Sequence, residues 1–180
     1  MLLNANDSCL IQIDVQEKLV PFIHMHEELV LQCRWMLDVA ALLEIPTVIT
    51  EQYPQGLGHT VAALREDGIA LSKTQFSCSE NEECLKVIRQ LNRNQVVLIG
   101  IETHVCVLQT AFGLQQAGKE VFIVADATES RRMQDKVLAI DRMQAAGIQI
   151  ISAEMALFEW CRDSKHPKFK ELSKRFLQKK

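Results

Sequence analysis

Three residues with different chemistry each follow a short apolar segment of the chain. Asp14 closes the segment SCLIQID, Lys73 follows a weaker apolar segment, and Cys106 lies shortly after QVVLIG. A carboxylate, an ammonium and a thiol are together the groups that nucleophilic catalysis requires. The carboxylate accepts the thiol proton, the ammonium stabilises the charged pair, and free backbone N–H groups receive the carbonyl oxygen. The pattern predicts this chemistry if the fold brings the three residues together.

Two of these residues also have plainer interpretations. An Asp that ends an apolar strand often serves as a helix cap or in a structural ion pair, because a buried carboxylate needs partners. A lone Lys after a strand is usually a solvated loop residue, since Lys is rarely fully buried. From residue types and positions alone, the catalytic interpretation and the plainer one stay open for both Asp14 and Lys73.

Cys106 is the only one of six cysteines placed in the first turn of a predicted helix after a strand. The free backbone N–H groups and the positive end of the helix dipole favour thiolate there, and the same groups can donate to an oxyanion. The other five cysteines fit the pattern of small core or surface residues: Cys9, Cys33, Cys78, Cys84 and Cys161.

The elements that must position these residues alternate between strand and helix. Short apolar or β-branched runs predict strands at residues 8–14, 46–50, 69–72, 95–100, 120–125 and 148–151. Helical spacing predicts helices at 27–43, 80–91 with Ser79 as a possible N-cap, 103–117 and 134–146. This alternation predicts a doubly wound parallel sheet with helices on both faces, in which ligands bind beyond the carboxyl ends of the strands.

Length, composition and net charge limit the classes of protein to which this chain can belong. The chain has 180 residues, 48% of them hydrophobic and 24% charged, with a net charge of −3. It therefore fits one globular domain, residues 1–180, and shows no general attraction to nucleic acid or membrane. The N-terminus lacks the pattern of a signal peptide, and the apolar runs are too short to span a bilayer. Because a chain with this much core does not need disulfides, we expect reduced thiols and a cytoplasmic location.

Five segments together are similar to one known family. IDVQEKL (13–19), TEQYPQGLG (50–58), SKTQFS (72–77), VLIGIETHVCVLQTA (97–111) and VADATESR (124–131) resemble the isochorismatase-like cysteine hydrolases, in particular their small single-domain branch. The resemblance runs from about residue 8 to 151, and the combination is more specific than any one segment. It implies a three-layer α/β fold whose six-stranded, mainly parallel sheet has the order 3-2-1-4-5-6.

The resemblance also implies a role for each site residue. Asp14 would be the general base, Lys73 its charge partner and Cys106 the nucleophile. The peptide bond between Ile101 and Glu102 would be cis, and the amides of Glu102 and Cys106 would form the oxyanion hole. The reaction would be hydrolysis of a small amide-type C–N bond through a Cys106 thioester.

The sequence departs from the family's nicotinamide amidases after the second strand. Those enzymes carry an Asp and two His metal ligands there, whereas this chain reads EQYPQG. We therefore expect no catalytic metal. We also expect no dinucleotide cofactor, because no G-x-G-x-x-G motif is present. Four residues are expected in the substrate pocket because they lie in the segments that follow the predicted strands: Gln16, Gln52, Tyr53 and Phe76.

The C-terminal segment, about residues 165–180, is basic and amphipathic. Its charge is +6, which leaves −9 for the rest of the chain, and its apolar residues recur at helical spacing. We expect a helix that packs on the core or on a neighbouring subunit; the alternative is contact with RNA or an anionic surface. A homo-oligomer is expected because small α/β domains often assemble, with no nucleic-acid or membrane partner.

Three functions therefore remain in competition. The first is the metal-independent cysteine hydrolase acting on a small amide. The second is vinyl-ether hydrolysis, the reaction for which the family is named, by acid catalysis at Asp14 without a thioester. The third is a non-catalytic binding subunit or redox-sensitive module, in which Cys106 is merely oxidisable.

Overall fold

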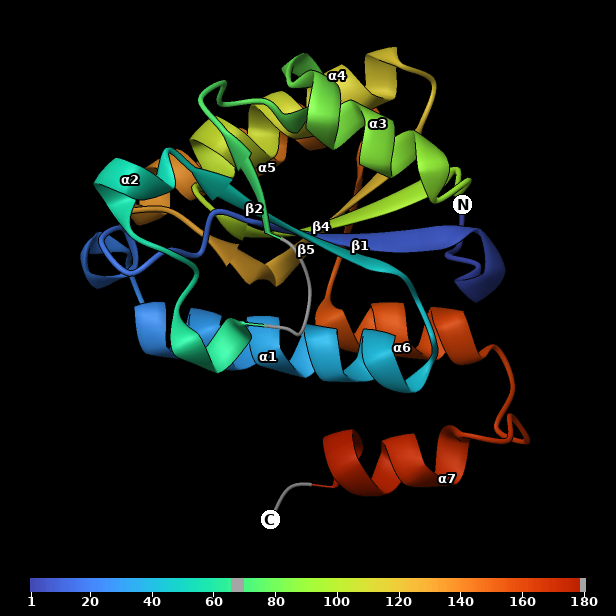
Figure 1. Ribbon diagram of the computed structural model, residues 1–180. Helices are drawn as coiled ribbons and strands as arrows, with labels where there is room; N and C mark the ends of the chain where they lie inside the picture. The colour runs from blue at the N-terminus through green and yellow to red at the C-terminus, as the bar shows by residue number, and fades with distance from the viewer. Residues whose placement is uncertain (66–69, 179–180) are drawn as a thin grey trace.

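A six-stranded parallel sheet forms the centre of the computed structural model, which describes residues 1–65 and 70–178 (Figure 1). Neighbouring strands are parallel throughout, in the order β3-β2-β1-β4-β5-β6. The predicted fold class and strand order are confirmed. The strands are β1 (Ser8–Ile13), β2 (Thr47–Gln52), β3 (Ala70–Lys73), β4 (Gln95–Ile101), β5 (Glu120–Glu129) and β6 (Gln149–Ile151).

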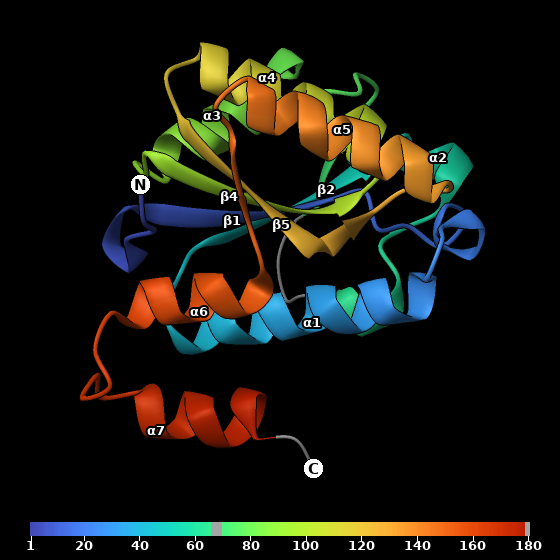
Figure 2. The same cartoon turned by 180° about the vertical axis from the view of Figure 1, so that it is seen from behind.

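Helices cover both faces of this sheet (Figures 1 and 2). On one face lie α1 (His26–Leu42) and α6 (Ala153–Cys161), and on the other lie α3 (Glu82–Gln90), α4 (Leu108–Gln116) and α5 (Met133–Ala145). The short helix α2 (Pro54–Leu57) follows β2. None of the helices that the structure describes is both long and apolar enough to cross a lipid bilayer.

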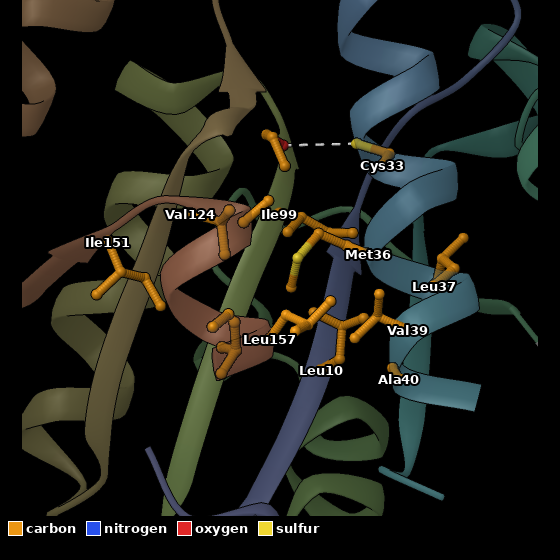
Figure 3. Packing of buried hydrophobic residues seen from close by; sticks show 14 of the residues in the cluster. Leu10, Cys33, Met36, Leu37, Val39, Ala40, Ile99, Val124, Ile151 and Leu157 are labelled. Atoms are coloured by element: carbon orange, nitrogen blue, oxygen red, sulfur yellow. Dashed lines mark hydrogen bonds between the residues drawn. The ribbon is translucent and has the colours of Figure 1, made fainter. Parts of the chain in front are cut away.

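The core is divided by the sheet into two apolar clusters. Successive side chains of a strand point to opposite faces, so β1 sends Leu10 towards α1 and α6 and sends Ile11 to the other side. Figure 3 shows the first cluster, in which Met36 of α1 and Leu157 of α6 lie beside the strands. Every residue of β1 and β4 is buried, which explains why their sequences are nearly continuous apolar runs.

Gly100 is required where β4 passes the end of β1. Its φ is +110°, and a Cβ at this position would lie 2.1 Å from the carbonyl oxygen of Ile13. No side chain can occupy that space, because the obstacle is backbone. The close approach brings the segment that carries Cys106 next to the strand that carries Asp14.

Several element boundaries differ from the prediction. The predicted helix at 80–91 begins at Glu82, and its N-cap is Asn81 instead of Ser79, because the Asn81 side chain accepts from the Cys84 N–H at 3.0 Å. β5 continues to Glu129, past a register shift opposite β4. Ile69, at the start of the predicted third strand, lies outside the described residues.

Helix α6 was absent from the prediction, although its start carries a local signal. The Ser152 side chain accepts from the Met155 N–H, and the Asp126 carboxylate accepts from the Ala153 N–H at 2.8 Å. The helix is short and buries one face, but its exposed face carries the apolar side chains of Met155 and Phe158, so the sequence lacks a clear polar face.

The C-terminal segment packs on the outside of α1 and α6 (Figure 2). Its helical part starts at Phe169, later than predicted, with α7 (Phe169–Leu172) followed by a π-helical turn, Ser173–Leu177. Leu172 is fully buried, and the ring of Phe176 meets Trp35 of α1 edge-on at 5.5 Å between centroids. This contact agrees with packing on the core, and we infer that the segment belongs to one domain with the sheet. Lys179 and Lys180 lie outside the described residues.

A buried polar side chain in β1 leads to a prediction about stability. Gln12 is 0% exposed, and neither its amide nitrogen nor its amide oxygen has a hydrogen-bond partner among the described residues. Such an unsatisfied amide costs roughly 1–3 kcal/mol, so we expect Gln12→Met to raise the free energy of unfolding by about 1 kcal/mol in urea denaturation. Gln12→Glu, which buries a charge, should lower it. A Gln12→Met protein that is less stable than the parent would contradict this interpretation.

Candidate active site

Three strand ends place the candidate catalytic residues at one edge of the sheet. Asp14 follows β1, Lys73 is the last residue of β3, and Cys106 lies in the π-helical turn Thr103–Val107 that follows β4. Asp14 has a left-handed backbone conformation with φ of +53°, which interrupts the side-chain alternation of the strand. All three side chains are buried, with residue exposures of 0%, 2% and 7%.

Asp14 and Lys73 form a fully buried ion pair. Lys73 Nζ donates to Asp14 Oδ2 at 2.6 Å, and the other carboxylate oxygen, Oδ1, accepts from the Thr50 hydroxyl at 2.8 Å. The plainer interpretation of Lys73 as a solvated loop residue is therefore wrong. A buried charge of this kind is tolerated only when each of its polar atoms has a partner.

Lys73 remains an ammonium in this environment. Burial by itself would lower the pKa of Lys73, but the negative charge of Asp14, with smaller contributions from Cys106 and Cys78, raises it above its ordinary value. The site therefore contains a fixed positive charge that does not act as a base near neutral pH.

The resting form of Cys106 is the thiol. Burial raises the pKa of the Cys106 thiol, and the negative charge of Asp14 raises it further, while Lys73 lowers it. The sequence argument had expected the helix end to favour thiolate. Desolvation and the adjacent carboxylate outweigh that effect, so the thiol needs a base before it can act as a nucleophile.

The segment just before Cys106 has an unusual backbone. The Ile101–Glu102 peptide bond is cis, at the position where the family resemblance places one. The Glu102 carbonyl accepts from the N–H groups of Val105 and Val107, whereas the Glu102 N–H donates no hydrogen bond within the described part of the chain. The Glu102 carboxylate pairs with Arg131 at 3.0 Å.

The four predicted pocket residues fall into two groups. Gln16 and Gln52 are buried and hydrogen-bonded to the protein: Lys73 Nζ donates to Gln52 Oε1 at 2.7 Å, and the Gln52 N–H donates to Gln16 Oε1 at 2.7 Å. Tyr53 and Phe76 are about half exposed, at 53% and 52%. Gln52 therefore contacts the Lys73 ammonium and Gln16 holds Gln52, while the two aromatic residues lie at the surface.

After β2, where the resemblance places the metal ligands of the nicotinamide amidases, this chain has a network of hydrogen bonds among its own side chains. Glu51 Oε1 accepts from both the N–H and the hydroxyl of Thr60, and Glu51 Oε2 lies 3.0 Å from His59 Nδ1. Within residues 1–65 and 70–178, no group of three or more His, Cys, Asp or Glu side chains is arranged to hold a metal ion.

A cleft of about 480 Å³ adjoins the Glu102 segment. It is mainly apolar with two cationic residues, and it includes none of the four predicted pocket residues. Its lining residues are Lys18, Leu19, Phe22, Ile23, Leu57, Glu102 and Arg131.

Thr50 is the site residue that sequence reasoning missed. It sits in the middle of β2, opposite Ile13 in register, and its hydroxyl reaches Asp14. A Thr in a strand usually reflects β propensity, so the sequence carried no separate signal for this contact.

Comparison with known proteins agrees with this fold. Residues 8–155 match the family model of the isochorismatase domain. Isochorismatase domain-containing protein 2 of Xenopus laevis is 41% identical over 175 residues, covering 96% of this chain and 84% of that protein. The matched domain and the parallel sheet define an isochorismatase-like α/β protein, from a class whose members are generally hydrolases. The chain belongs to the isochorismatase-like family.

Solved structures extend the comparison. A Caenorhabditis elegans protein described as MAR1 ribonuclease is 37% identical, with a TM-score of 0.92 over 99% of this chain and 93% of that chain. The YcaC gene product of Escherichia coli, described as an octameric hydrolase of unknown specificity, has a TM-score of 0.88 over 98% and 96% of the two chains. At 23% identity it shares the fold. The chain spans 57% of the length of isochorismatase domain-containing protein 1 of Salmo salar, to which it is 40% identical over 161 residues.

The charges around Cys106 predict how its reactivity depends on pH. Because the Asp14 carboxylate raises the pKa of the thiol, Asp14→Asn should move the midpoint of Cys106 alkylation by iodoacetamide to lower pH. The rate is followed by mass spectrometry of the peptide that contains Cys106. Cys161→Ala, on the opposite face of the sheet, is the control and should leave the midpoint unchanged. A midpoint that stays in place or rises in Asp14→Asn would show that Asp14 does not act on this thiol.

Proposed function

We propose that this protein is a metal-independent cysteine hydrolase that cleaves a C–N bond in a small amide. The observation that carries the proposal is the buried Lys73–Asp14 pair at 2.6 Å, whose charges both act on the Cys106 thiol. In the resting state, the ammonium, the carboxylate and the neutral thiol sum to zero charge. Transfer of the thiol proton to Asp14 leaves a thiolate, a carboxylic acid and an ammonium, which again sum to zero. The low-dielectric site therefore gains no net charge when the nucleophile forms.

The reaction then follows the chemistry of acyl transfer. Asp14 takes the proton from Cys106, and the sulfur attacks the carbonyl carbon of the amide. The N–H groups of Glu102 and Cys106 receive the developing oxyanion. Collapse of this intermediate breaks the C–N bond, and Asp14 returns the proton to the departing amine.

Water completes the cycle. Asp14, again a carboxylate, takes a proton from water as the oxygen attacks the thioester carbonyl. The C–S bond breaks, and the sulfur recovers a proton from Asp14 as the carboxylic acid product leaves. The sum of the two stages is amide plus water giving acid plus amine, so no cofactor is consumed.

Turnover of a panel of small amides tests this mechanism. We expect Cys106→Ala to abolish hydrolysis and Asp14→Asn to lower kcat by about 10³–10⁴-fold, because the base and the nucleophile act as a unit. Cys161→Ala should retain full activity. Intact-protein mass spectrometry during turnover should show an acyl adduct that is absent from Cys106→Ala.

The other functions give different results in the same experiment. Vinyl-ether hydrolysis at Asp14 would proceed without an adduct and would survive Cys106→Ala. A non-catalytic module would turn over no amide, ester or vinyl ether while Cys106 still reacts with iodoacetamide. RNA belongs in the panel because of the ribonuclease description of the C. elegans protein. We propose no nucleic-acid substrate, since the net charge is −3 and the site holds one buried ammonium instead of an array of cations.

We further propose that the protein forms a homo-oligomer in the cytoplasm. The octameric E. coli neighbour supports assembly, as do three half-exposed apolar side chains on α5, from Met133, Val137 and Leu138. All six cysteines are unpaired and buried, which suits a reducing compartment. Static light scattering should give a multiple of the monomer mass, and a monomer at micromolar concentration would contradict the assembly.

A further inference from the structure

The Lys73 ammonium has a second partner besides Asp14. Its Nζ donates to Asp14 Oδ2 at 2.6 Å and to Gln52 Oε1 at 2.7 Å. An ammonium has three N–H groups, so these two contacts leave one N–H that they do not use. Because the ammonium is tetrahedral, fixing the directions of two N–H bonds also fixes the direction of the third.

Gln52 is itself held on several sides. Its Nε2 donates to the Thr74 carbonyl at 2.7 Å, and its backbone N–H donates to Gln16 Oε1. Gln16 Nε2 donates to the carbonyls of Gln52 at 3.0 Å and Gly58 at 2.6 Å. The orientation of the Gln52 amide is unambiguous, because an ammonium can only donate and therefore requires the oxygen to face it. Register places Gln52 directly beside Lys73 on the neighbouring strand.

We propose that Gln52, held by Gln16, is a positioning residue that fixes the Lys73 ammonium between Asp14 and Cys106. The inference rests on the proposed function and deepens it by naming the group that orients the charge partner. It also changes the role that the sequence suggested for these glutamines. Both N–H groups of the Gln16 amide are used by carbonyls, and the Gln52 oxygen is used by Lys73, so neither side chain is free to bind substrate through those atoms.

A neutral amide suits this position better than a carboxylate. The amide oxygen stabilises an ammonium without adding charge, so the charges of Asp14, Lys73 and Cys106 still sum to zero. A carboxylate at position 52 would compete with Asp14 for Lys73 and would place a second negative charge near the thiol. Both effects disfavour the thiolate.

Two substitutions of Gln52 separate charge from positioning, with Gln55→Met as the matched control on an exposed residue of α2. Iodoacetamide alkylation of Cys106 in the full chain, followed against pH, needs no substrate. We expect Gln52→Glu, which keeps the side-chain length, to move the alkylation midpoint to higher pH. In amide turnover, Gln52→Met should lower kcat by about 10- to 100-fold with little change in KM, because the ammonium loses its second anchor. Gln55→Met should match the parent protein in both measurements.

The results distinguish positioning from a purely structural role. If Gln52 only stabilises the fold, both variants will melt at lower temperature while the alkylation midpoint and kcat remain those of the parent, and the inference is then wrong. If Gln52→Met does not fold, Gln52→Asn, which keeps an amide but shortens its reach to Lys73, replaces it in the turnover measurement, where the same loss of kcat is expected. If no amide is turned over by the parent protein, the proposed function fails while the alkylation profiles still test Gln52. An unchanged Gln52→Glu profile in a protein that requires Cys106 for turnover would overturn the inference alone.

Discussion

A buried ion pair is the constraint on which the site depends. Lys73 and Asp14 are both withdrawn from water, and removing two charges from water costs several kcal/mol for each ion. Their attraction offsets this cost only if the remaining polar atoms are also satisfied. Thr50 satisfies the second carboxylate oxygen and Gln52 the ammonium. Removing any one partner would leave a charge or a dipole unpaired in the core.

The doubly wound sheet supplies these partners without relying on long loops. Thr50 and Gln52 are two residues apart on β2, between the strands that lead to Asp14 and Lys73. Side chains two residues apart on a strand share a face, so one strand can serve both ions. Gly100 then allows β4 to approach β1 closely enough to place the Cys106 turn beside the pair. The two apolar clusters, one on each face of the sheet, pack against the strands that carry this arrangement.

The same constraint explains why Cys106 is a thiol in the resting protein. Burial and Asp14 keep Cys106 protonated, and Lys73 opposes them. Under the proposed mechanism, the thiol becomes a nucleophile only when its proton moves to the carboxylate that holds the lysine. A thiol that is buried and protonated is oxidised less readily than an exposed thiolate, because oxidation proceeds through the thiolate. The five other cysteines are also buried, in the two core clusters.

The sequence by itself determined the parallel sheet, its helical layers and the strand ends that Asp14, Lys73 and Cys106 follow or close. Those features follow from apolar periodicity and from the types of residue that close each strand, which are local properties. Only the tertiary structure decided that Lys73 is buried, that Thr50 and Gln52 complete its ion pair, and that the C-terminal segment packs on Trp35. It also decided the direction in which the pKa of Cys106 moves. These properties depend on contacts between residues far apart in the chain and on the exclusion of water, neither of which a local pattern can encode.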